Sequence, residues 1–323
     1  MQRRTFAALG IALAASIPFA ASAQGGFPSK PVKFIVPYAA GGLPDSVARI
    51  VAQKLTERLG QSVVVDNKPG GNGVVAYQNL MAGVADSHSF IVSDGSMLSI
   101  TPQLNKAANY QVGKELLPVS LIARSPLFLV AHPKTGVKTL KEFVEKTKAA
   151  PGEFTYGSSG IGSTHHLTME AIKADLKLDV RHVPFRGSGQ SVPALIGGQV
   201  DFLFAALPSM VGFLKAGQVS LIASNDAKRS PLAPEVPTIA EVIPGFDFSV
   251  TVGALARAGT SPEAIKRVSE EIAWAVKQPD VIEKLQGAGI NPVGGSPEAY
   301  RKEIERENLA MAKAGKHADL KAD

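Results

Sequence analysis

The residues of this chain whose spacing could serve a functional site are serines, threonines and glycines. They are not cysteines or metal-binding residues. The sequence contains no cysteine, so a thiol nucleophile is excluded. Its six histidines include one cluster, His165-His166. Neighbouring helical residues point about 100° apart, unlike the i, i+4 pair of an HExxH zinc site. No Walker A lysine or G-x-S-x-G elbow accompanies the glycines. Neither metal nor nucleophilic catalysis is favoured.

Five polar loops point to anion binding instead, because each is expected to follow a strand and to open a helix. They are Tyr38–Asp45, Ser93–Ser96, Ser158–Thr164, Phe185–Ser191 and Ala205–Ser209. Ligands of open α/β sheets bind at this edge, and the free N–H groups and positive end of a helix attract anions. Any single loop is more simply an ordinary capped turn. The five together favour a ligand site.

Alternating strand and helix patterns predict where these loops lie. Runs of β-branched residues predict strands, and apolar residues at helical spacing, such as Val47, Ile50 and Val51, predict helices between them. The expected strands are residues 32–36, 63–65, 90–93, 127–131, 154–157, 180–183, 201–204, 219–223 and 248–255. This order predicts an α/β fold with parallel sheets covered by helices.

The length and the last strand predict two domains. At about 100–200 residues per domain, 323 residues suffice for two, each with its own core. After the strand at 248–255 we expect only helices, at 262–277, 280–288 and 297–314. The chain should therefore cross back from the second α/β module to the first. We expect a discontinuous domain 1 (27–124 plus 250–323), a domain 2 (125–249) and a hinged cleft between them.

The composition is that of a globular protein and does not indicate a nucleic-acid partner. Hydrophobic residues make up 45% of the chain and charged residues 19%, which excludes wholesale disorder. There are 34 Lys and Arg against 28 Asp and Glu, a formal charge of +6 that falls to +4 without Arg3 and Arg4 of the leader. Because no run of basic residues accompanies this mild excess, no nucleic-acid footprint is expected.

Residues 1–23 have the pattern of a secretory signal peptide. Arg3 and Arg4 precede an apolar stretch at 6–17, and Ala-Ser-Ala at 21–23 is a small-x-small site before Gln24. A membrane anchor is disfavoured because the apolar stretch is shorter than the ~18 residues of a span. The adjacent arginines also fit a twin-arginine signal, so the Sec and twin-arginine routes both stay open. We expect the mature protein in the periplasm.

Several motifs are shared with a known family. They begin with F-P-S-K-P-V-K-F-I-V-P at 27–37, Gly41-Gly42 and D-S-V-A-R at 45–49, and continue with V-V-V-D-N-K-P-G-G at 63–71. They return at 156–160, 182–187, 197–201, 228–230, 236–238 and 292–298. In this combination, over nearly all of the mature chain, the sequence resembles the Bug-type solute receptors of tripartite tricarboxylate transporters.

The resemblance implies a periplasmic binding protein type II-like fold, in which two α/β domains close on a ligand at a hinged cleft. It implies a periplasmic receptor that binds a small carboxylated ligand through backbone amides, hydroxyls and ordered water. We expect this receptor to be a monomer. Such a receptor delivers its ligand to the membrane subunits of a tripartite tricarboxylate transporter. The resemblance implies no catalytic activity, no cofactor and no metal.

Two departures from the family pattern bear on the ligand. Family members commonly carry a Gly-Thr-Asp-like stretch where this chain has Leu43-Pro44-Asp45, and Asp or Asn where it has Ala205-Ala206. The loss of these polar groups argues against a ligand amino or hydroxyl group, which would be left unpaired. We therefore expect an aliphatic or aromatic dicarboxylate, with phthalate and terephthalate types included, rather than citrate or an amino acid.

The expected contacts come from both domains. The ligand-binding residues are predicted to be Tyr38, Ala40, Gly41, Gly42, Ser93, Ser158, Ser159, Gly162, Ser163, Thr164, Arg186 and Ala205. Arg186 fits a bidentate carboxylate contact and a solvated loop position equally well. Asp45 would repel an anion, so we expect it to cap the first helix instead.

Two other functions stay open. An exported hydrolase would use Ser158 or Ser159, and a base within hydrogen-bond reach of either hydroxyl would favour it. The sequence offers only His165 and His166 nearby. A sensor that docks on a signalling protein would bind its ligand as a transport receptor does, so the sequence does not separate these two functions.

The leader makes the first testable prediction. Protein recovered from the periplasmic fraction should begin at Gln24, because the small-x-small site ends at Ala23. Intact-mass analysis should give the mass of residues 24–323. A chain that retains Met1 in the membrane fraction would contradict a cleaved leader.

Overall fold

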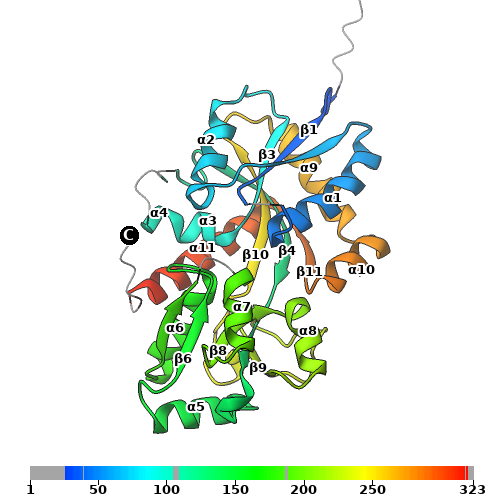
Figure 1. Cartoon of the computed structure of the whole chain (residues 1–323). Coiled ribbons are helices and arrows are strands. Elements are labelled where there is room, and N and C mark those ends of the chain that lie inside the picture. The colour runs from blue at the N-terminus through cyan, green and yellow to red at the C-terminus, as the bar shows by residue number, and fades with distance from the viewer. Residues whose placement is uncertain are drawn as a thin grey trace, which may run out of the picture.

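Two lobes, each built around one mixed sheet, make up the protein (Figure 1). The computed structural model describes residues 26–38, 40–104, 108, 110–185, 188–316 and 318. The predicted signal peptide lies outside these residues. The strands of the first sheet run in the order β2-β1-β3-β10-β4-β11, and those of the second in the order β7-β6-β8-β5-β9. The expected arrangement of two α/β domains is confirmed.

The elements of each lobe come from separate stretches of the chain. The first sheet contains β1 (Val32–Val36), β2 (Val63–Asn67), β3 (Ser89–Asp94), β4 (Leu116–Ser125), β10 (Val250–Arg257) and β11 (Asn291–Gly295). Its helices are α1 (Leu43–Leu59), α2 (Val74–Ala82), α3 (Gly95–Ser99), α4 (Thr101–Leu104), α9 (Pro262–Ala275), α10 (Pro279–Gly287) and α11 (Pro297–Gly315). The second sheet contains β5 (Leu127–Ala131), β6 (Thr155–Ser158), β7 (Arg181–Pro184), β8 (Phe202–Ala206) and β9 (Ser220–Ser224). Its helices are α5 (Leu140–Ala149), α6 (Thr164–Leu176), α7 (Ser188–Ile196) and α8 (Leu207–Lys215), and short 3₁₀ turns are η1 (Gly71–Gly73), η2 (Pro133–Thr135) and η3 (Ile239–Glu241).

Both sheets share one pairing scheme. In the first, β1 pairs in parallel with β2 and β3, and β10 pairs antiparallel with β3. In the second, β6 pairs in parallel with β7 and β8, and β5 pairs antiparallel with β8. The strands that make these antiparallel pairs, β10 and β5, arrive from the other lobe rather than through a helix on their own sheet, so the geometry of a β-α-β unit is not imposed. The prediction of wholly parallel sheets is wrong for this reason.

Two strands are absent from the sequence prediction, β4 and β11. The sequence of β11 is N-P-V-G-G, which combines residues disfavoured in strands, and it lies at the sheet edge, where Pro is tolerated. In β4, Pro118 lies beside an irregularity in the pairing with β10. The expectation that only helices follow residue 255 is therefore wrong.

The cores lie between each sheet and its helices. Val47, Val51 and Leu55 are fully buried on one face of α1 and belong to the same apolar cluster as Phe34 of β1. Each such side chain contributes about 1.5–3 kcal/mol by leaving water. This packing fixes α1 against the strand that precedes it, and so fixes the direction in which the N-terminus of α1 points.

The chain crosses between the lobes in two places, at residues 124–127 and 247–250, and we call these two segments with Asn225 the junction. Asn225 is fully buried. Its Oδ1 accepts a hydrogen bond from the Leu127 amide at 2.8 Å, and its Nδ2 donates to the Phe248 carbonyl at 2.6 Å. One side chain therefore ties both crossing segments together.

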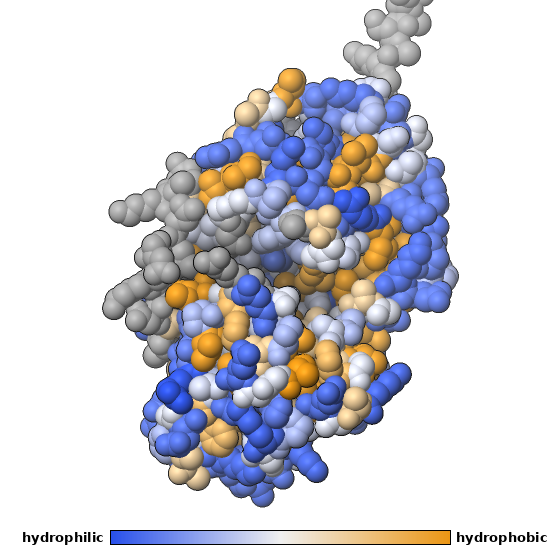
Figure 2. Space-filling view, viewed as in Figure 1, coloured by the Kyte–Doolittle hydropathy of each residue, from blue (hydrophilic) through white to orange (hydrophobic). Residues whose placement is uncertain are grey.

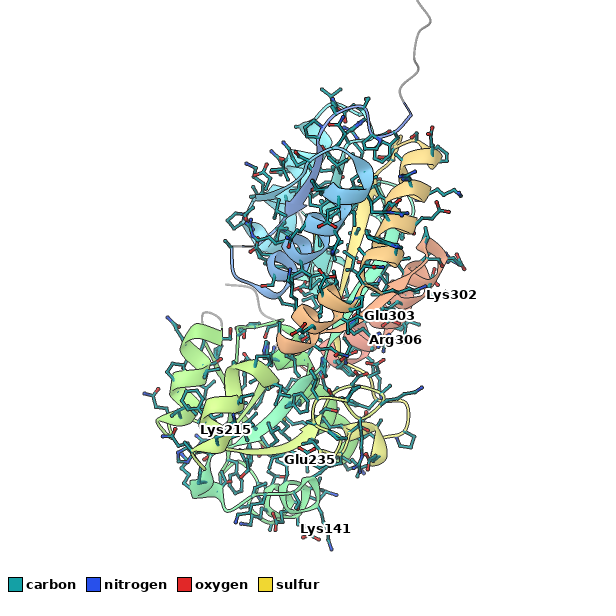
Figure 3. The ribbon with its side chains drawn as sticks, turned by 90° about the vertical axis from the view of Figure 1, so that its right-hand side faces the viewer. Lys141, Lys215, Glu235, Lys302, Glu303 and Arg306 are labelled. Atoms are coloured by element: carbon teal, nitrogen blue, oxygen red, sulfur yellow. The ribbon has the colours of Figure 1, made fainter. Side chains whose placement is uncertain are left out.

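Four charged side chains surround the junction. Arg124 pairs with Asp247 at 2.9 Å and with Glu303 at 2.5 Å, while Arg306 pairs with Glu303 at 2.6 Å and with Asp247 at 3.2 Å. Glu303 and Arg306 belong to α11, which lies where the two lobes meet (Figure 3). Helix α11 also contacts α3 in one lobe and α6 in the other. We propose that this junction separates domain 1 (27–124 plus 250–323) from domain 2 (125–249).

The junction makes a testable prediction. Replacing Asn225 with Ala should lower the free energy of unfolding by about 2–5 kcal/mol, because a buried amide and a buried carbonyl each lose a partner. Urea denaturation measures this loss. Asn79→Ala, on the exposed side of α2, is the control and should change stability by no more than about 0.5 kcal/mol. Equal losses of unfolding free energy in the two variants would contradict the claim that Asn225 stabilises the junction.

Candidate functional site

A cavity of about 830 Å³ lies between the two lobes. The space-filling view shows the surface hollowed there, with apolar side chains gathered around the hollow (Figure 2). The first lobe contributes Tyr38 and Gly41–Pro44 to its lining, and the second contributes Ser159 and Ile161–His165. Since both lobes supply walls, a ligand in the cavity would touch both.

The N-terminal ends of helices from both lobes meet at this cavity. Its lining includes the N-cap residues Gly42 of α1, Ser163 of α6 and Ala206 of α8, and also Ser188, the first residue of α7. The first amides of a helix have no acceptor within the helix, and they carry the positive end of its dipole. The cavity is therefore surrounded by hydrogen-bond donors suited to an anion.

No Lys or Arg side chain is among the described residues that line the cavity. His165 lines it, and burial lowers the pKa of His165 to about 4, so this ring is neutral at pH 7. Positive potential in this part of the structure therefore comes from helix ends rather than from cationic side chains.

Apolar side chains make up much of the remaining wall. Leu43 and Ile100 come from the first lobe, Leu127 and Ala205 from the second, and Val250 from the junction. These groups offer no hydrogen bonds, so they suit the hydrocarbon part of a ligand.

One acidic group, Asp94, also lines the cavity. Its Oδ1 accepts hydrogen bonds from the Tyr38 hydroxyl at 2.7 Å and the Ser96 hydroxyl at 2.6 Å. Burial raises the pKa of Asp94, although the bonds from Ser96 and Tyr38 act in the opposite direction. Burial and the nearby Asp94 charge raise the pKa of Tyr38 well above its ordinary value, so the phenol stays protonated and donates to Asp94.

The expectation that Asp45 caps the first helix is wrong: its carboxylate holds the loop before the helix instead. The N-cap of α1 is Gly42, and Asp45 lies in the first turn. Its carboxylate accepts hydrogen bonds from the Gly41 amide at 2.8 Å, Asn67 Nδ2 at 2.8 Å and Arg49 Nε at 3.0 Å. The Gly41 amide, expected to face the ligand, is therefore already engaged by Asp45.

The loop before α6 presents a free hydroxyl. Ser159 lines the cavity, and its Oγ is buried with no hydrogen-bond partner in the described part of the chain. Gly160 and Gly162 adopt φ values of 128° and 74°, which side-chain-bearing residues rarely adopt. These two glycines turn the backbone sharply enough to place both Ser159 and the first turn of α6 at the cavity.

The structure brings most of the predicted site residues together. Those that line the cavity are Tyr38, Gly41, Gly42, Ser159, Gly162, Ser163, Thr164 and Ala205. Three others are outside its lining: Ala40 is exposed, and Ser93 and Ser158 are fully buried. Arg186 lies outside the described residues.

Some lining residues are absent from the sequence prediction. Asp94 and Ser96 lie in a predicted loop, but neither they nor His165 are among the predicted contacts. Ala288 and Ile290 line the cavity between α10 and β11. This segment leads into β11, a strand that the sequence does not predict, so no strand-loop-helix pattern there indicated a site.

A base does lie beside Ser158, but it is His182 rather than the expected His165 or His166. His182 Nε2 is 2.6 Å from Ser158 Oγ, a hydrogen bond in which either atom can donate. Burial, His166 and Lys173 lower the pKa of His182 to about 3, which makes it a poor base at pH 7. Ser158 is fully buried and is not part of the cavity lining, so a substrate in the cavity would not reach this pair.

Comparison with known proteins decides the family. A family model described as the tripartite tricarboxylate transporter family receptor matches residues 47–315. The chain belongs to this family. It is 31% identical over 311 residues to a protein from the tcbD–tcbE intergenic region of Pseudomonas sp. strain P51, with 94% of this chain and 92% of that protein covered. Protein BugT of Bordetella pertussis is also 31% identical, with 92% of each chain covered.

Solved structures confirm the fold. A Rhodopseudomonas palustris protein with adipate is 30% identical, with a TM-score of 0.79 over 90% of this chain and 98% of that one. MatC from Rhodopseudomonas palustris with bound malate is 27% identical, with a TM-score of 0.74 over 89% and 99% of the two chains. The Bug-type resemblance and the periplasmic binding protein type II-like fold class are both confirmed.

The described residues contain no helix with the length and apolar character of a membrane span. Within the same ranges, no three His, Cys, Asp or Glu side chains are grouped so that they could hold a metal ion.

Asp45 gives a prediction about pH. Burial alone would raise the pKa of Asp45, but the hydrogen bonds from Arg49, Gly41 and Asn67 outweigh it and lower the pKa. Its contribution to stability is therefore complete above the ordinary Asp value of about 3.9 and is lost as pH falls through the lower folded-state pKa. Asp45→Asn should cost about 1–3 kcal/mol at pH 7.

The difference in unfolding free energy between wild type and Asp45→Asn should then narrow as pH is lowered from 7 to 3. Urea denaturation at several pH values measures it. A difference that stays constant over this range would show that the carboxylate charge is not what stabilises the loop.

Proposed function

We propose that the protein is a monomeric periplasmic receptor that binds a small dicarboxylate between its lobes and delivers it to the membrane subunits of a tripartite tricarboxylate transporter. One observation carries the proposal: helix N-termini from both lobes meet at one cavity, and no Lys or Arg lines the described part of it. Family membership and the absence of a membrane-spanning helix from the described residues support it.

Carboxylates match this set of donors. A carboxylate has about four acceptor sites and no donor, and each charge-assisted hydrogen bond contributes about 1.5–3 kcal/mol. A ligand with a carboxylate at each end would use the first turns of α1 and α6 at once. Such a ligand binds the closed arrangement better than an open one, and this difference is what drives closure.

The apolar part of the wall favours a hydrocarbon body between the two carboxylates. Two relatives were solved with such acids, one with adipate and MatC with malate. Adipate has a plain four-carbon body, whereas malate carries a hydroxyl group that needs a partner. Leu43, Pro44 and Ala205 offer none, so we propose an aliphatic or aromatic dicarboxylate, adipate-like or terephthalate-like, over hydroxy acids such as malate or citrate.

We also propose that the protein is not an enzyme. The pair formed by Ser158 and His182 is the arrangement in the described residues that most resembles a catalytic nucleophile and base. The serine is fully buried, and the histidine has a pKa of about 3. Ser159, which does line the cavity, has no hydrogen-bonded base among the described residues.

Titration calorimetry tests the proposed function. Adipate should bind at least about tenfold more tightly than hexanoate, and terephthalate more tightly than benzoate, because each monocarboxylate lacks one set of charge-assisted bonds. Ser159→Ala should weaken dicarboxylate binding by about tenfold, since its hydroxyl is the unpaired donor at the cavity.

Ser191→Ala is the matched control. Its hydroxyl is also buried without a partner in the described chain, but Ser191 does not line the cavity, so affinity should not change. No binding of any dicarboxylate, or equal affinity for mono- and dicarboxylates, would contradict the proposed function. Unchanged affinity in Ser159→Ala would place the ligand elsewhere.

A further inference from the structure

Three rings stack behind the loop that precedes α6. His182 of β7 stacks against both Tyr156 of β6 and His166 of α6, and the centroids of these two rings are themselves 6.5 Å apart. The two imidazole centroids are 4.0 Å apart with planes 8° from parallel, and the Tyr156 centroid is 4.8 Å from that of His182. Tyr156 and His166 are buried, at 0% and 2% exposure. This stack is outside the cavity lining, so the proposed ligand contacts do not account for it.

Both histidines form hydrogen bonds to the loop. His182 Nε2 lies 2.6 Å from Ser158 Oγ, at the start of the loop. His166 Nδ1 accepts a hydrogen bond from the Gly162 amide at 3.0 Å, near its end. Between these points the Gly160 amide donates to Ser158 Oγ at 3.1 Å, and Ser163 Oγ donates to the Gly160 carbonyl at 2.7 Å. The stack therefore holds the loop from behind at both ends.

The other side of the same loop faces the cavity. Ser159 and the segment from Ile161 to Thr164 line the cavity. Ser159 Oγ is unpaired, and the first amides of α6 follow directly. The hydrogen bond to Gly162 thus fixes a residue of the cavity lining, and the bond to Ser158 fixes the neighbour of Ser159.

The bond between His166 and Gly162 requires a neutral ring. A backbone amide can only donate, so His166 Nδ1 must be unprotonated to accept. Two charged imidazoles stacked 4.0 Å apart would also repel each other.

The charged and titratable groups around the stack in the described chain are few. Glu170 of α6 accepts a hydrogen bond from the Tyr156 hydroxyl at 2.5 Å and pairs with Lys173 at 2.7 Å. Lys173 Nζ also lies 5.6 Å from the Tyr156 ring centroid. Arg181 precedes His182 on β7 and is exposed. Burial and Lys173 lower the pKa of His166 while Glu170 acts in the opposite direction, and burial, His166 and Lys173 lower the pKa of His182 to about 3.

We propose that His166 and His182 are positioning residues of the ligand site, which as neutral imidazoles hold residues 158–163 in the shape that presents Ser159 and the first turn of α6 to a carboxylate. This role rests on the proposed function of the cavity. Protonation of His166 turns Nδ1 into a donor that opposes the Gly162 amide. Ligand affinity is then lost as pH falls through the folded-state pKa of His166, which burial places below the ordinary histidine value.

A first experiment needs no ligand. Amide hydrogen exchange of Gly162, followed by NMR in the full mature chain, should become about tenfold faster in His166→Ala, because one hydrogen bond is lost. His166→Asn keeps an acceptor oxygen near the position of Nδ1 and should restore protection. His132→Ala is the matched control: His132 Nδ1 accepts the Lys134 amide at 3.1 Å, outside the cavity lining, and its loss should leave Gly162 unchanged. Exchange of Gly162 at the wild-type rate in His166→Ala overturns the proposal.

A second experiment measures affinity for adipate and terephthalate between pH 7.5 and pH 4.5. His166→Ala should bind about tenfold more weakly at pH 7.5, and His166→Asn within about threefold of wild type. On acidification, wild type should lose affinity relative to His166→Asn, which cannot titrate, while protonation of the ligand affects both equally. The proposal is overturned if the ratio of wild-type to His166→Asn affinity stays constant over this pH range. It is also overturned if His166→Asn binds as weakly as His166→Ala. If exchange responds as predicted but wild type binds no dicarboxylate, the proposed function fails instead.

Discussion

A buried anion that meets no cationic side chain must be met by N–H and O–H donors, and the proposed ligand site places this constraint on how both sheets are arranged. The helices α1, α6, α7 and α8 all begin at the cavity, directly after the strands β1, β6, β7 and β8. The pairing scheme of the two sheets makes this possible, because parallel neighbours end at the same edge. Pro44 and Pro208, near the starts of α1 and α8, favour helix initiation there. Donors fixed by a helix need little reorganisation when a ligand arrives.

The junction lets two such sets of donors share one ligand. Asn225 holds the crossing segments together, and the charges of Arg124, Asp247, Glu303 and Arg306 neutralise one another around it. Removing one member of such a cluster would leave an unpaired buried charge, which costs more than the intact cluster contributes. The lobes are therefore joined at a defined place.

The sequence predicts the helices and strands whose hydrophobic patterns are regular. The prediction fails where a segment's composition disfavours the structure that its place in the fold gives it. The β-branched strands and the long amphipathic helices are predicted, whereas β11, with Pro and two Gly, forms only because the edge of the first sheet accepts it. The loops of the site are predicted from their Gly and Ser content. Within them, Ser93 and Ser158 are fully buried while Asp94 and Ser159 line the cavity. Ser93 and Asp94 diverge because successive strand residues face opposite sides, and Ser159 lies just beyond the end of β6. His165 and His166 diverge for the corresponding helical reason, one toward the cavity and one into the stack. Propensity alone does not reveal which of two neighbours faces a ligand.

The most direct test of the central claim is a crystal structure of the mature protein with adipate or terephthalate. The account predicts that one carboxylate accepts hydrogen bonds, within about 3 Å, from Ser159 and the first turn of α6. It predicts that the other carboxylate reaches the start of α1, with the hydrocarbon body against Leu43 and Ala205. A dicarboxylate bound outside this cavity, or touching only one lobe, would contradict it.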